Sequence, residues 1–534
     1  MSYLNSGPSI VNTTPWTPLP AHSWSGPERW AWEQIRRGNI ADFNAPLVAD
    51  GKEPLDVTTS TVCQEDWERC GIRANFLRTI LFCQPWCDAI THKGIRIIGA
   101  AIEERLLLDS AQIDHEFQLE GSILLKGFCC SYSYFKFNLS LEKSYLDELD
   151  ARGVHVKGLI SLRWAIIANN TIMDGAGIKG GIFLKEGRFG KTRLPNMRVG
   201  NQADCRATFT GTLNLNKTRF NDSLFLEGAV CKDVDISGAN IGGKLALGGV
   251  QLKGKLILKQ VFVKSNIELN GAEATEADLS GMEVKGNLYC QGTAFNKCIL
   301  SQTSVDTVYD GKKENRDMGF WPEQIKIDRF VYRNLRGEPG DDSQQNDSSD
   351  DPSERCSWWY KKWLGSHHPY TPKPYRQCAK SLRESGHPGR AKEILFLAKE
   401  RERKAAFKQR RWGRWMAMLL LEGLIGYGLG WRFKVFPLMW AILLLAAGMW
   451  VSYGAPVLIN KSTLSYEYTR DCWWCLGLSL DRLLPVVQLG KDYSDCVFIG
   501  WRRFYFIAHT LCGWALALFI AAGLAGVAKP GGRD

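Results

Sequence analysis

Residues 224–269 read LFLEGAVCKDVDISGANIGGKLALGGVQLKGKLILKQVFVKSNIEL, and this stretch decides the fold of the larger part of the chain. It is a ladder of short apolar triplets, which from Leu245 onward start eleven residues apart, at Leu245, Leu256 and Ile267. Each triplet has the alternating period of a short strand, and Gly, Asn or Lys follows it where the chain must turn. The pattern therefore predicts a coil of short strands rather than a meander.

The same rhythm runs from about Ile95 to Leu300, for example at residues 100–102 and 176–178. A repeat this short cannot bury its own apolar face, so successive copies must stack and share one core. We expect a right-handed parallel β-solenoid with Leu, Ile, Val, Ala and Gly inside and Lys, Glu, Asp and Asn outside. The Ala-Asp-Leu step at 277–279 is similar to the theme of pentapeptide repeats. Most coils depart from a five-residue period, so a looser coil than the regular square helix is predicted.

Composition bounds the function. The 534 residues allow two to four domains, and 23% charged with 45% hydrophobic residues suits a chain that is partly globular and partly membrane-bound. The mean hydropathy of −0.20 argues against a polytopic transporter. No secretory signal is seen in residues 1–20, which are polar, so the solenoid is expected in the cytoplasm.

Cysteines and histidines predict neither a metal site nor a cofactor. Most of the sixteen cysteines are scattered singly among apolar neighbours, as reduced buried thiols are. Cys63, Cys70, Cys83 and Cys87 fall close together, but their gaps do not follow the pairs of a zinc site. The eight histidines include no HExxH pair.

The chain divides into several predicted regions. Trp30, Trp32, Ile35 and Ile40 are expected on one side of the first helices, and such helices would cover the open end of the solenoid. The regions are a disordered terminus (1–22), a helical N-terminal cap (23–92), the β-helix (93–305), a C-terminal cap (306–336), an acidic disordered linker (337–357), a tetratricopeptide-like helical hairpin connector (358–411), an interfacial or additional membrane helix (412–430) and a membrane anchor (431–530).

Two apolar runs, 435–451 and 504–527, are long enough to span a bilayer. The run 412–430 is less apolar, and we favour a position along the interface over a third span. The excess of basic residues before the first span and after the second predicts that both termini face the cytoplasm, although Arg502 and Arg503 argue the other way.

The segment 471–490 between the spans, DCWWCLGLSLDRLLPVVQLG, is too apolar for a solvated loop. It is expected to dip into the membrane or to pack on its surface. Asp481, Arg482 and Pro485 are the candidates for a pore lining, because charges in hydrocarbon must pair or face water. The alternative is an interfacial helix that keeps both charges among the headgroups. Cys472 and Cys475 have redox spacing, but no βαβ pattern surrounds them, so a structural disulfide or free thiols are favoured over catalysis.

Two glycine motifs lie within the solenoid. Residues 175–180 match the dinucleotide fingerprint, but a ladder rung follows instead of a helix. Residues 238–244 match a phosphate-binding loop up to the position of its final hydroxyl, where Leu245 stands. Both motifs are therefore interpreted as solenoid turns. A third, Gly-Tyr-Gly at 426–428, precedes the first strong span, where a potassium filter has no place.

A polybasic block, 399–414, holds eight basic residues against two Glu. Next to apolar helices it is expected to bind anionic lipid, with about 1 kcal/mol for each charge near the surface. A nucleic-acid role for this block is disfavoured because no aromatic-interleaved binding fold accompanies it. The lipid-binding candidates are Lys399, Arg401, Arg403, Lys404, Lys408, Arg410, Arg411 and Arg414.

Four stretches, 32–43, 94–100, 370–375 and 480–490, carry a resemblance to bacterial membrane proteins with pentapeptide-like β-helices, which are often named membrane-associated oxidoreductases. The resemblance implies a β-helix in the cytoplasm held at the inner membrane. Our leading hypothesis is a non-enzymatic scaffold or sensor, with a protein partner on the β-helix and with homo-oligomers as one arrangement. The alternatives are an oligomeric ion channel with segment 471–490 near the pore and an oxidoreductase, as the family name implies.

Overall fold

The computed structural model describes residues 19–49, 53–59, 61–311, 321–336, 357–428, 432–460, 465–468, 471–484, 489–490, 493 and 497–527. The chain forms two compact units, one of 1–355 with 362–368 and the other of 356–361 with 369–534. Residues 1–18 and 337–356, which the sequence predicts to be disordered, lie outside the described residues.

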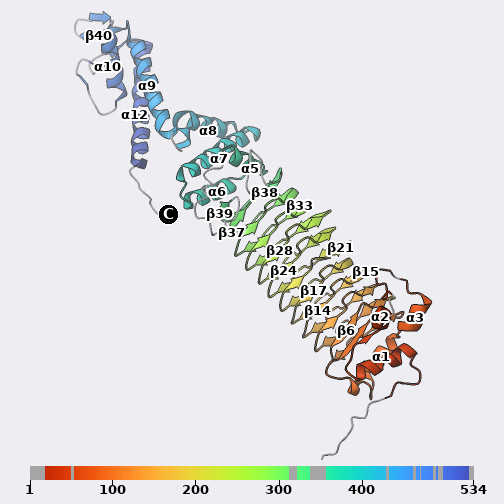
Figure 1. The fold of residues 1–534 in the computed structure, drawn as a ribbon. Coiled ribbons are helices and arrows are strands. Elements are labelled where there is room, and N and C mark those ends of the chain that lie inside the picture. Colours follow the sequence, from red (N-terminus) through yellow and green to blue (C-terminus); the bar gives the residue numbers. More distant parts are fainter. Residues whose placement is uncertain are drawn as a thin grey trace, which may run out of the picture. The chain divides into compact units, whose positions relative to one another are not determined.

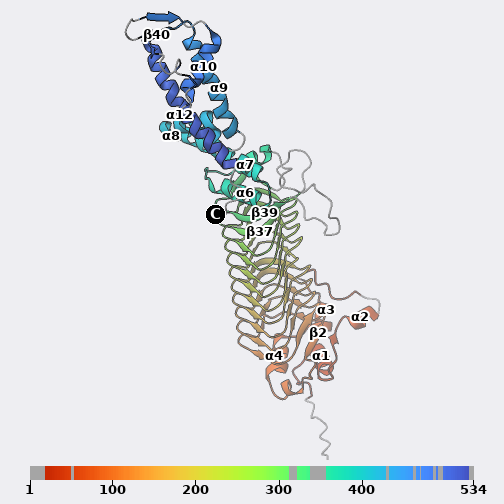
Figure 2. The ribbon, with the colours of Figure 1, turned by 90° about the vertical axis from the view of Figure 1, so that its left-hand side faces the viewer.

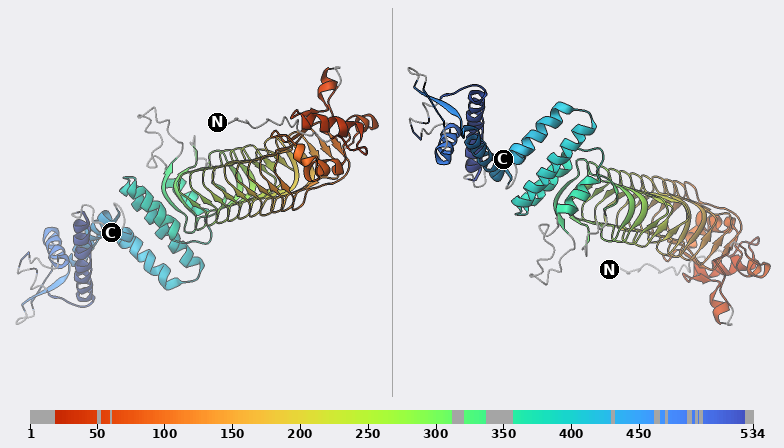
Figure 3. Two further views of the ribbon diagram at one scale, coloured as in Figure 1. Left: turned by 90° about the horizontal axis from the view of Figure 1, so that it is seen from below. Right: turned by 90° about the horizontal axis from the view of Figure 1, so that it is seen from above.

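A β-solenoid of about ten parallel turns makes up most of the first unit (Figure 1). Its strands fall into two long sheets, of 22 and 17 strands, and the ladder pairings between their described strands are parallel. Figures 2 and 3 show the same stack of turns from three further directions. The predicted solenoid is confirmed, and strands continue beyond its expected end: within 306–336, β38 (Gln324–Lys326) and β39 (Val331–Arg336) still pair in parallel with earlier strands.

The eleven-residue period is half a turn of this coil. Leu224 pairs with Leu245, and Leu245 with Ile267, so a full turn takes 21 or 22 residues. Leu256, midway between Leu245 and Ile267, instead pairs with Val234 in the other sheet. Successive triplets therefore alternate between the two sheets.

Many turns carry four short strands, and in others two of these join into one longer strand, such as β15 (Ile166–Ile172). One turn contains β27 (Asn240–Ile241) and β28 (Leu245–Ala246) in the first sheet, followed by β29 (Gln251–Leu252) and β30 (Lys255–Ile257) in the second. A residue with left-handed backbone recurs at intervals of ten or eleven, for example at Gly238 (φ 69°), Gly249 (φ 63°) and Gln260 (φ 54°). Glycine is favoured at such corners because a Cβ is strained there. The coil is four-sided but exceeds the 20 residues that four five-residue sides would take.

Apolar columns fill the solenoid interior, and hydroxyl groups link some turns. Leu245, Leu256 and Ile267 are fully buried. Buried Ser144 Oγ accepts a hydrogen bond from Ser122 N (3.0 Å) and donates one to Leu119 O (2.8 Å). Such side-chain bonds satisfy backbone groups at buried corners, where an unpaired group costs about 1–3 kcal/mol.

Three helices lie against the first strands of the solenoid. Helix α1 (Gly26–Arg36) contacts β1 (Ala41–Asp42) and β2 (Ile95–Ile98). Helix α3 (Gln64–Cys70) contacts β3 (Ala101–Ile102), and α4 (Ala74–Phe82) contacts β4 (Leu106–Leu107). The short α2 (Ala45–Ala49) and η1 (Cys87–Ala89) complete this region.

The burial of these first helices differs from the prediction at two residues. Trp32 and Ile35 are fully buried, but Trp30 is 36% and Ile40 44% exposed. The buried positions of α1 follow helical spacing, i, i+3, i+4 and i+7 from Glu28, which turns Trp30 to another side. Ile40 follows the end of the helix at Arg36.

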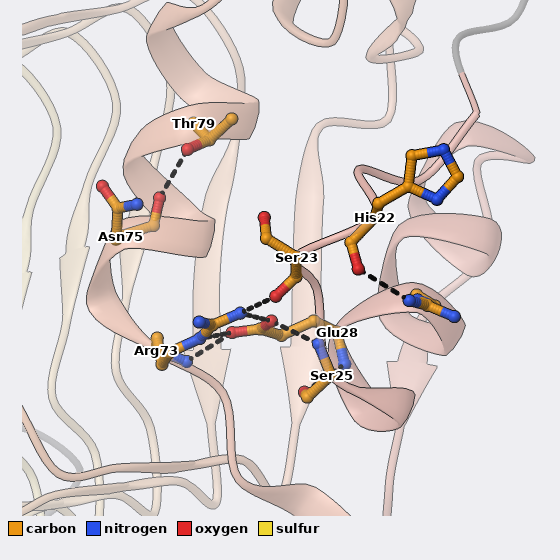
Figure 4. A network of polar contacts seen from close by, with 8 residues as sticks. His22, Ser23, Ser25, Glu28, Arg73, Asn75 and Thr79 are labelled. Atoms are coloured by element: carbon orange, nitrogen blue, oxygen red, sulfur yellow. Dashed lines mark hydrogen bonds and ion pairs between the residues drawn. The ribbon is translucent and has the colours of Figure 1, made fainter.

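A buried carboxylate joins two of these helices (Figure 4). Glu28 is fully buried on α1, where Ser25 forms a capping box with it. Its oxygens accept hydrogen bonds from Ser25 N (2.8 Å) and from Arg73 N, Nε and Nη2 (3.0, 2.8 and 2.6 Å). Arg73 also donates a hydrogen bond to Ser23 O (2.7 Å). This single residue, which directly precedes α4, therefore binds both α1 and the segment that leads into α1.

Aromatic rings lie over the last turns of the solenoid. The Trp363 ring, on the part of α5 (Ser357–Gly365) that belongs to this unit, is 4.9 Å from that of Trp321 and 6.3 Å from that of Tyr332. Ile327 N donates to His367 Nδ1 (3.2 Å).

The second unit is mainly helical. Helices α6 (Lys373–Glu384) and α7 (Pro388–Lys408) form the hairpin that the sequence predicts. The remaining elements are α8 (Trp412–Ile425), η4 (Gly426–Gly428), α9 (Arg432–Ser452), β40 (Pro456–Asn460), β41 (Ser465–Tyr468), α10 (Cys472–Leu483), β42 (Val497–Phe498) and α12 (Trp501–Val527). Strand β40 pairs in antiparallel fashion with β41 and β42.

Helices α9, α10 and α12 pack together. Among the described residues, the stretch Val435–Ser452 of α9 is the one segment found long and apolar enough, by length and composition, to cross a membrane. Helix α12 contains the second predicted apolar run.

Candidate functional site

The eight residues of the polybasic block lie on and between two helices. The last turns of α7 carry five of them, Arg410 and Arg411 form the connection, and Arg414 stands in the first turn of α8. The α7 helix extends this far because its sequence is rich in Ala, Leu, Lys, Glu and Arg, all strong helix formers. Five of the eight cations interact with partners in the same unit.

Two glutamates of α7 neutralise much of the block. Glu402 forms ion pairs with Lys399 (N–O distance 3.0 Å) and Arg414 (2.5 Å), and Glu400 forms one with Lys404 (2.7 Å). The ion pair with Lys404 lowers the pKa of Glu400. Burial opposes ionisation of Glu402, but its two cations lower its pKa overall.

Two further cations bind other groups of this unit. Arg403 Nε lies 3.0 Å from a Glu422 oxygen on α8, and Arg401 Nη1 donates to the Tyr375 hydroxyl (3.0 Å) on α6. Tyr427 OH also donates to Glu422 (3.0 Å). These contacts connect α6, α7 and α8, so we assign them to positioning the helices.

Lys408, Arg410 and Arg411 are exposed, and among the described residues they have no ion-pair or hydrogen-bond partner on their side chains. They adjoin a cluster of aromatic rings, in which the ring centroid of Phe407 lies 5.3 Å from that of Trp412 and 5.6 Å from that of Trp415. Trp412 is 55% exposed. Cations and tryptophans in this arrangement are typical of the boundary between water and a lipid bilayer.

The α8 helix continues this surface with an exposed apolar face. Met416, Leu419, Leu420 and Leu424 are 40–56% exposed and follow Trp412 at helical spacing, so they share one side. Met418, by contrast, is buried. An apolar face of this length in contact with water is unfavourable, and burying it in an interface would contribute about 25 cal/mol for each Å² of apolar surface.

The two cysteines with redox spacing differ in environment. Cys472 is exposed at the start of α10, whereas Cys475 is fully buried one turn later, and both are free thiols. Asp471 caps this helix by accepting a hydrogen bond from Trp473 N (3.0 Å). Among the described residues, no group of three or more His, Cys, Asp and Glu side chains is arranged to hold a metal ion.

The pore candidates lie at the end of α10. Asp481 is 9% exposed and accepts a hydrogen bond from Leu489 N (2.8 Å), and Arg482 Nη2 donates to Tyr493 O (3.0 Å). Both side chains are bonded within the unit, on the connection between α10 and α12. Pro485 lies outside the described residues.

A polar contact between α10 and α12 is absent from the sequence-based candidates. Buried His509 Nε2 lies 3.2 Å from Ser479 O, and Ser479 Oγ donates to Leu445 O (3.0 Å) on α9. Gly448 makes room for this contact, because a Cβ there would lie 2.2 Å from Ser479 Oγ. The signal in the sequence is the polar Ser479 and His509 within apolar runs, at positions that meet only when three helices pack.

The glycine motifs are solenoid turns, as predicted. Gly175 has φ 70° at a corner, Gly177 lies in β16 (Gly177–Ile178), and Gly238 has φ 69° at another corner. No helix follows either motif.

Comparison of the chain with protein-family models finds no matching family, and comparisons with curated proteins and with solved structures find no significant match.

Proposed function

We propose that this protein is a membrane-anchored scaffold or sensor whose β-solenoid presents an interaction surface in the cytoplasm, at the bacterial inner membrane. The observation that carries the membrane part is the order of exposed side chains along the second unit. Unpaired Lys408, Arg410 and Arg411 stand between the exposed rings of Phe407 and Trp412, and the apolar face of α8 and then the apolar helix α9 follow. This order matches the anionic headgroups, the interface and the hydrocarbon of a bilayer.

In this proposal α8 lies along the interface, and α9 and α12 cross the membrane with both chain termini in the cytoplasm. The 18 residues Val435–Ser452 support this arrangement, because at 1.5 Å per residue they rise about 27 Å, close to the roughly 30 Å of hydrocarbon. Helix α10, packed against both, then lies beside the spans.

The solenoid part of the proposal rests on its covered ends. We take the coil as right-handed, as parallel crossover connections almost always are. Helices α1, α3 and α4 would act as an N-terminal cap and prevent edge-to-edge pairing with other chains. A capped coil leaves its long faces free for partners.

The test measures anionic lipid bound to the full chain. K408Q/R410Q/R411Q is compared with K399Q/R401Q/K404Q, a control with the same change in charge at cations that already have partners within the unit. Purified protein in neutral detergent is titrated with phosphatidylglycerol, and bound lipid is counted by native mass spectrometry. With about 1 kcal/mol per charge, the first variant should lose about 3 kcal/mol, or roughly 100-fold in affinity. Equal losses in both variants would contradict a specific lipid surface.

The position of α8 is tested by photocrosslinking in membranes. A benzoylphenylalanine at Leu420, on the exposed apolar face, should label lipid, whereas the same group at Lys404 should not. Labelling of protein alone from Leu420 would show that a partner, and not lipid, covers this face.

A further inference from the structure

One face of the solenoid carries cations that have almost no acidic partners. The face is formed by seven strands on consecutive turns, together with the residue after each, and we call it the basic face. The strands are β9 (Tyr134–Phe135), β13 (His155–Val156), β16 (Gly177–Ile178), β19 (Arg198–Val199), β23 (Arg219–Phe220), β27 (Asn240–Ile241) and β31 (Phe262–Val263). None of these strand residues or their immediate followers is acidic.

The cations stand in columns that the register defines. Phe135, Val156 and Ile178 are paired in register, so the residues that follow them, Lys136, Lys157 and Lys179, occupy three successive turns. On the next two turns the charge moves to the neighbouring column, where Arg198 pairs directly with Arg219. These five residues are exposed.

Hardly any of this charge is neutralised. Among the described residues, Lys179, Arg198 and Arg219 have no ion pair or hydrogen bond on their side chains, and Lys136 reaches Asp114 only at 4.0 Å. Like charges directly opposite one another on neighbouring strands destabilise a sheet. The cost of this arrangement is not offset within the unit.

The other faces of the same coil differ. Glu276 forms ion pairs with both Lys255 (3.1 Å) and Lys297 (2.5 Å). Lys244 pairs with Glu268 (3.0 Å), and Arg193 pairs with Asp174 (3.0 Å). Cations elsewhere on the solenoid are thus often neutralised across turns. On another face, Lys232 and Lys253 follow the paired Cys231 and Leu252 and also lack an ion pair among the described residues, but they cover only two turns, whereas the cations of the basic face cover five.

Flat side chains accompany the cations. The first column of the basic face reads Tyr134, His155, Gly177, Arg198 and Arg219 in register. A Cβ on Gly177 would lie 3.3 Å from the His155 ring, so this exposed ring packs next to the neighbouring glycine. Lys157 stands 5.7 Å above the Tyr134 ring. Aromatic rings and guanidinium planes are surfaces on which nucleobases stack.

We propose that the basic face binds single-stranded nucleic acid, with bases stacked on Tyr134, His155 and the arginines and with phosphates along the lysine column. Turns lie about 4.8 Å apart, so the seven strands give a straight platform about 29 Å long. An acidic polypeptide would use the cations but would have no need of the flat column. This inference rests on the proposed role of the solenoid as an interaction surface, and it concerns a different surface from the polybasic block on α7 and α8.

The test uses the full chain in discs of phosphatidylcholine and a fluorescein-labelled oligothymidylate of about 12 nucleotides, a length within the usual site size. Anisotropy titrations over a salt series compare the wild type with K157Q/K179Q/R198Q/R219Q. The matched control, K244Q/K255Q/K297Q/R193Q, removes the same charge from paired positions on other faces. The first variant should lower the slope of log K against log salt by about 3, near 0.7 for each lost phosphate contact. The control should leave the slope unchanged.

A second variant, Y134A/H155A, separates stacking from charge. It should weaken binding at least fivefold, since stacking contributes about 1–3 kcal/mol per base, and it should leave the salt slope unchanged. Oligoglutamate of equal charge that binds as tightly as the oligonucleotide would overturn the proposal in favour of an acidic polypeptide. Equal loss in the control, or loss in K408Q/R410Q/R411Q instead, would also overturn it. Lipid binding by the α7–α8 surface is measured separately, so failure here leaves that result standing.

Discussion

Replacing Glu28 with Gln should loosen the helical region at the start of the solenoid. The carboxylate is fully buried and accepts four hydrogen bonds, one from Ser25 and three from Arg73. A glutamine of the same shape keeps one acceptor oxygen and loses the charge. Its amide group would also face the donors of Arg73.

The expected loss is about 3 kcal/mol. Hydrogen bonds to a charged group contribute about 1.5–3 kcal/mol each, and breaking a buried ion pair costs about 3–5 kcal/mol. The side chain of Arg73 is 51% exposed, so its charge recovers water when the partner is lost, and the cost lies at the lower end. A loss of 3 kcal/mol corresponds to a roughly 100-fold larger population of the opened state.

Hydrogen exchange of the α1 and α4 amides in the full chain measures this opening. Glu33→Gln is the matched control, because Glu33 stands on the same helix but pairs with Arg36 and Arg37 at the surface, where such pairs contribute about 0.2–1 kcal/mol. Exchange should rise about 100-fold for Glu28→Gln and less than about fivefold for Glu33→Gln. Similar effects of the two substitutions would refute the assignment of Glu28 as the link between the helices.

The same residue predicts a pH dependence. Burial alone would raise the pKa of the Glu28 carboxyl, but its hydrogen bonds from Arg73 and Ser25 and the charge of Arg73 lower the pKa overall. A carboxyl with a depressed folded-state pKa stabilises the fold above its unfolded-state pKa of about 4.3, and this contribution is lost as the pH falls through the folded value. Opening of the wild-type region should therefore increase below about pH 4.3, while this component should be missing from Glu28→Gln.

Three further predictions concern packing and thiols. Gly513→Ala should lower the melting temperature of the solubilised protein, because its Cβ would lie 2.1 Å from a backbone oxygen of α10. The control Gly423→Ala, whose Cβ would have nothing within 4 Å, should be neutral or stabilising, and equal shifts in the two variants would contradict the close approach of the helices. Native protein should present Cys472 but not Cys475 to a thiol reagent without reductant, and protection of both until reductant is added would show a disulfide instead. Ser144→Ala should cost about 1–3 kcal/mol in chemical unfolding, because it leaves two buried backbone groups unpaired, and no loss would show that those groups find other partners.

The fold could be predicted because the solenoid repeats a local pattern. The triplets at Leu245, Leu256 and Ile267 show the alternating period of strands, and their spacing equals the half turn that the pairings reveal. The same pattern explains why the glycines at 175–180 form a turn. Helix burial was harder to predict. The apolar pattern places Trp30 on the side of Trp32, but residues two positions apart on a helix point in different directions, and Trp30 is exposed.

The candidate surfaces could be predicted only in part. The polybasic block is continuous in sequence, but its division into paired and unpaired cations depends on the return of α8 past α7, which brings Arg414 to Glu402. The basic face is less visible still, because its column depends on accumulated register. His155 to Gly177 is a step of 22 residues and Gly177 to Arg198 one of 21. A constant period of 22 would place the buried Val199 in the column instead.

Charged residues occur in two arrangements on the surface of this solenoid. Where a lysine on one turn pairs with a glutamate on another, as at Lys297 and Glu276, the two charges cancel at a distance, and the pair affects only the packing of those turns. Where Arg198 lies directly beside Arg219, like charges repel, and with Lys136, Lys157 and Lys179 they place cations on five successive turns, whose fields add. Such a column attracts a long anion far more than a single ion, since a chain of charges can match several rungs at once. A partner of the basic face should therefore be a polymer, and its affinity should grow with length until it covers the platform.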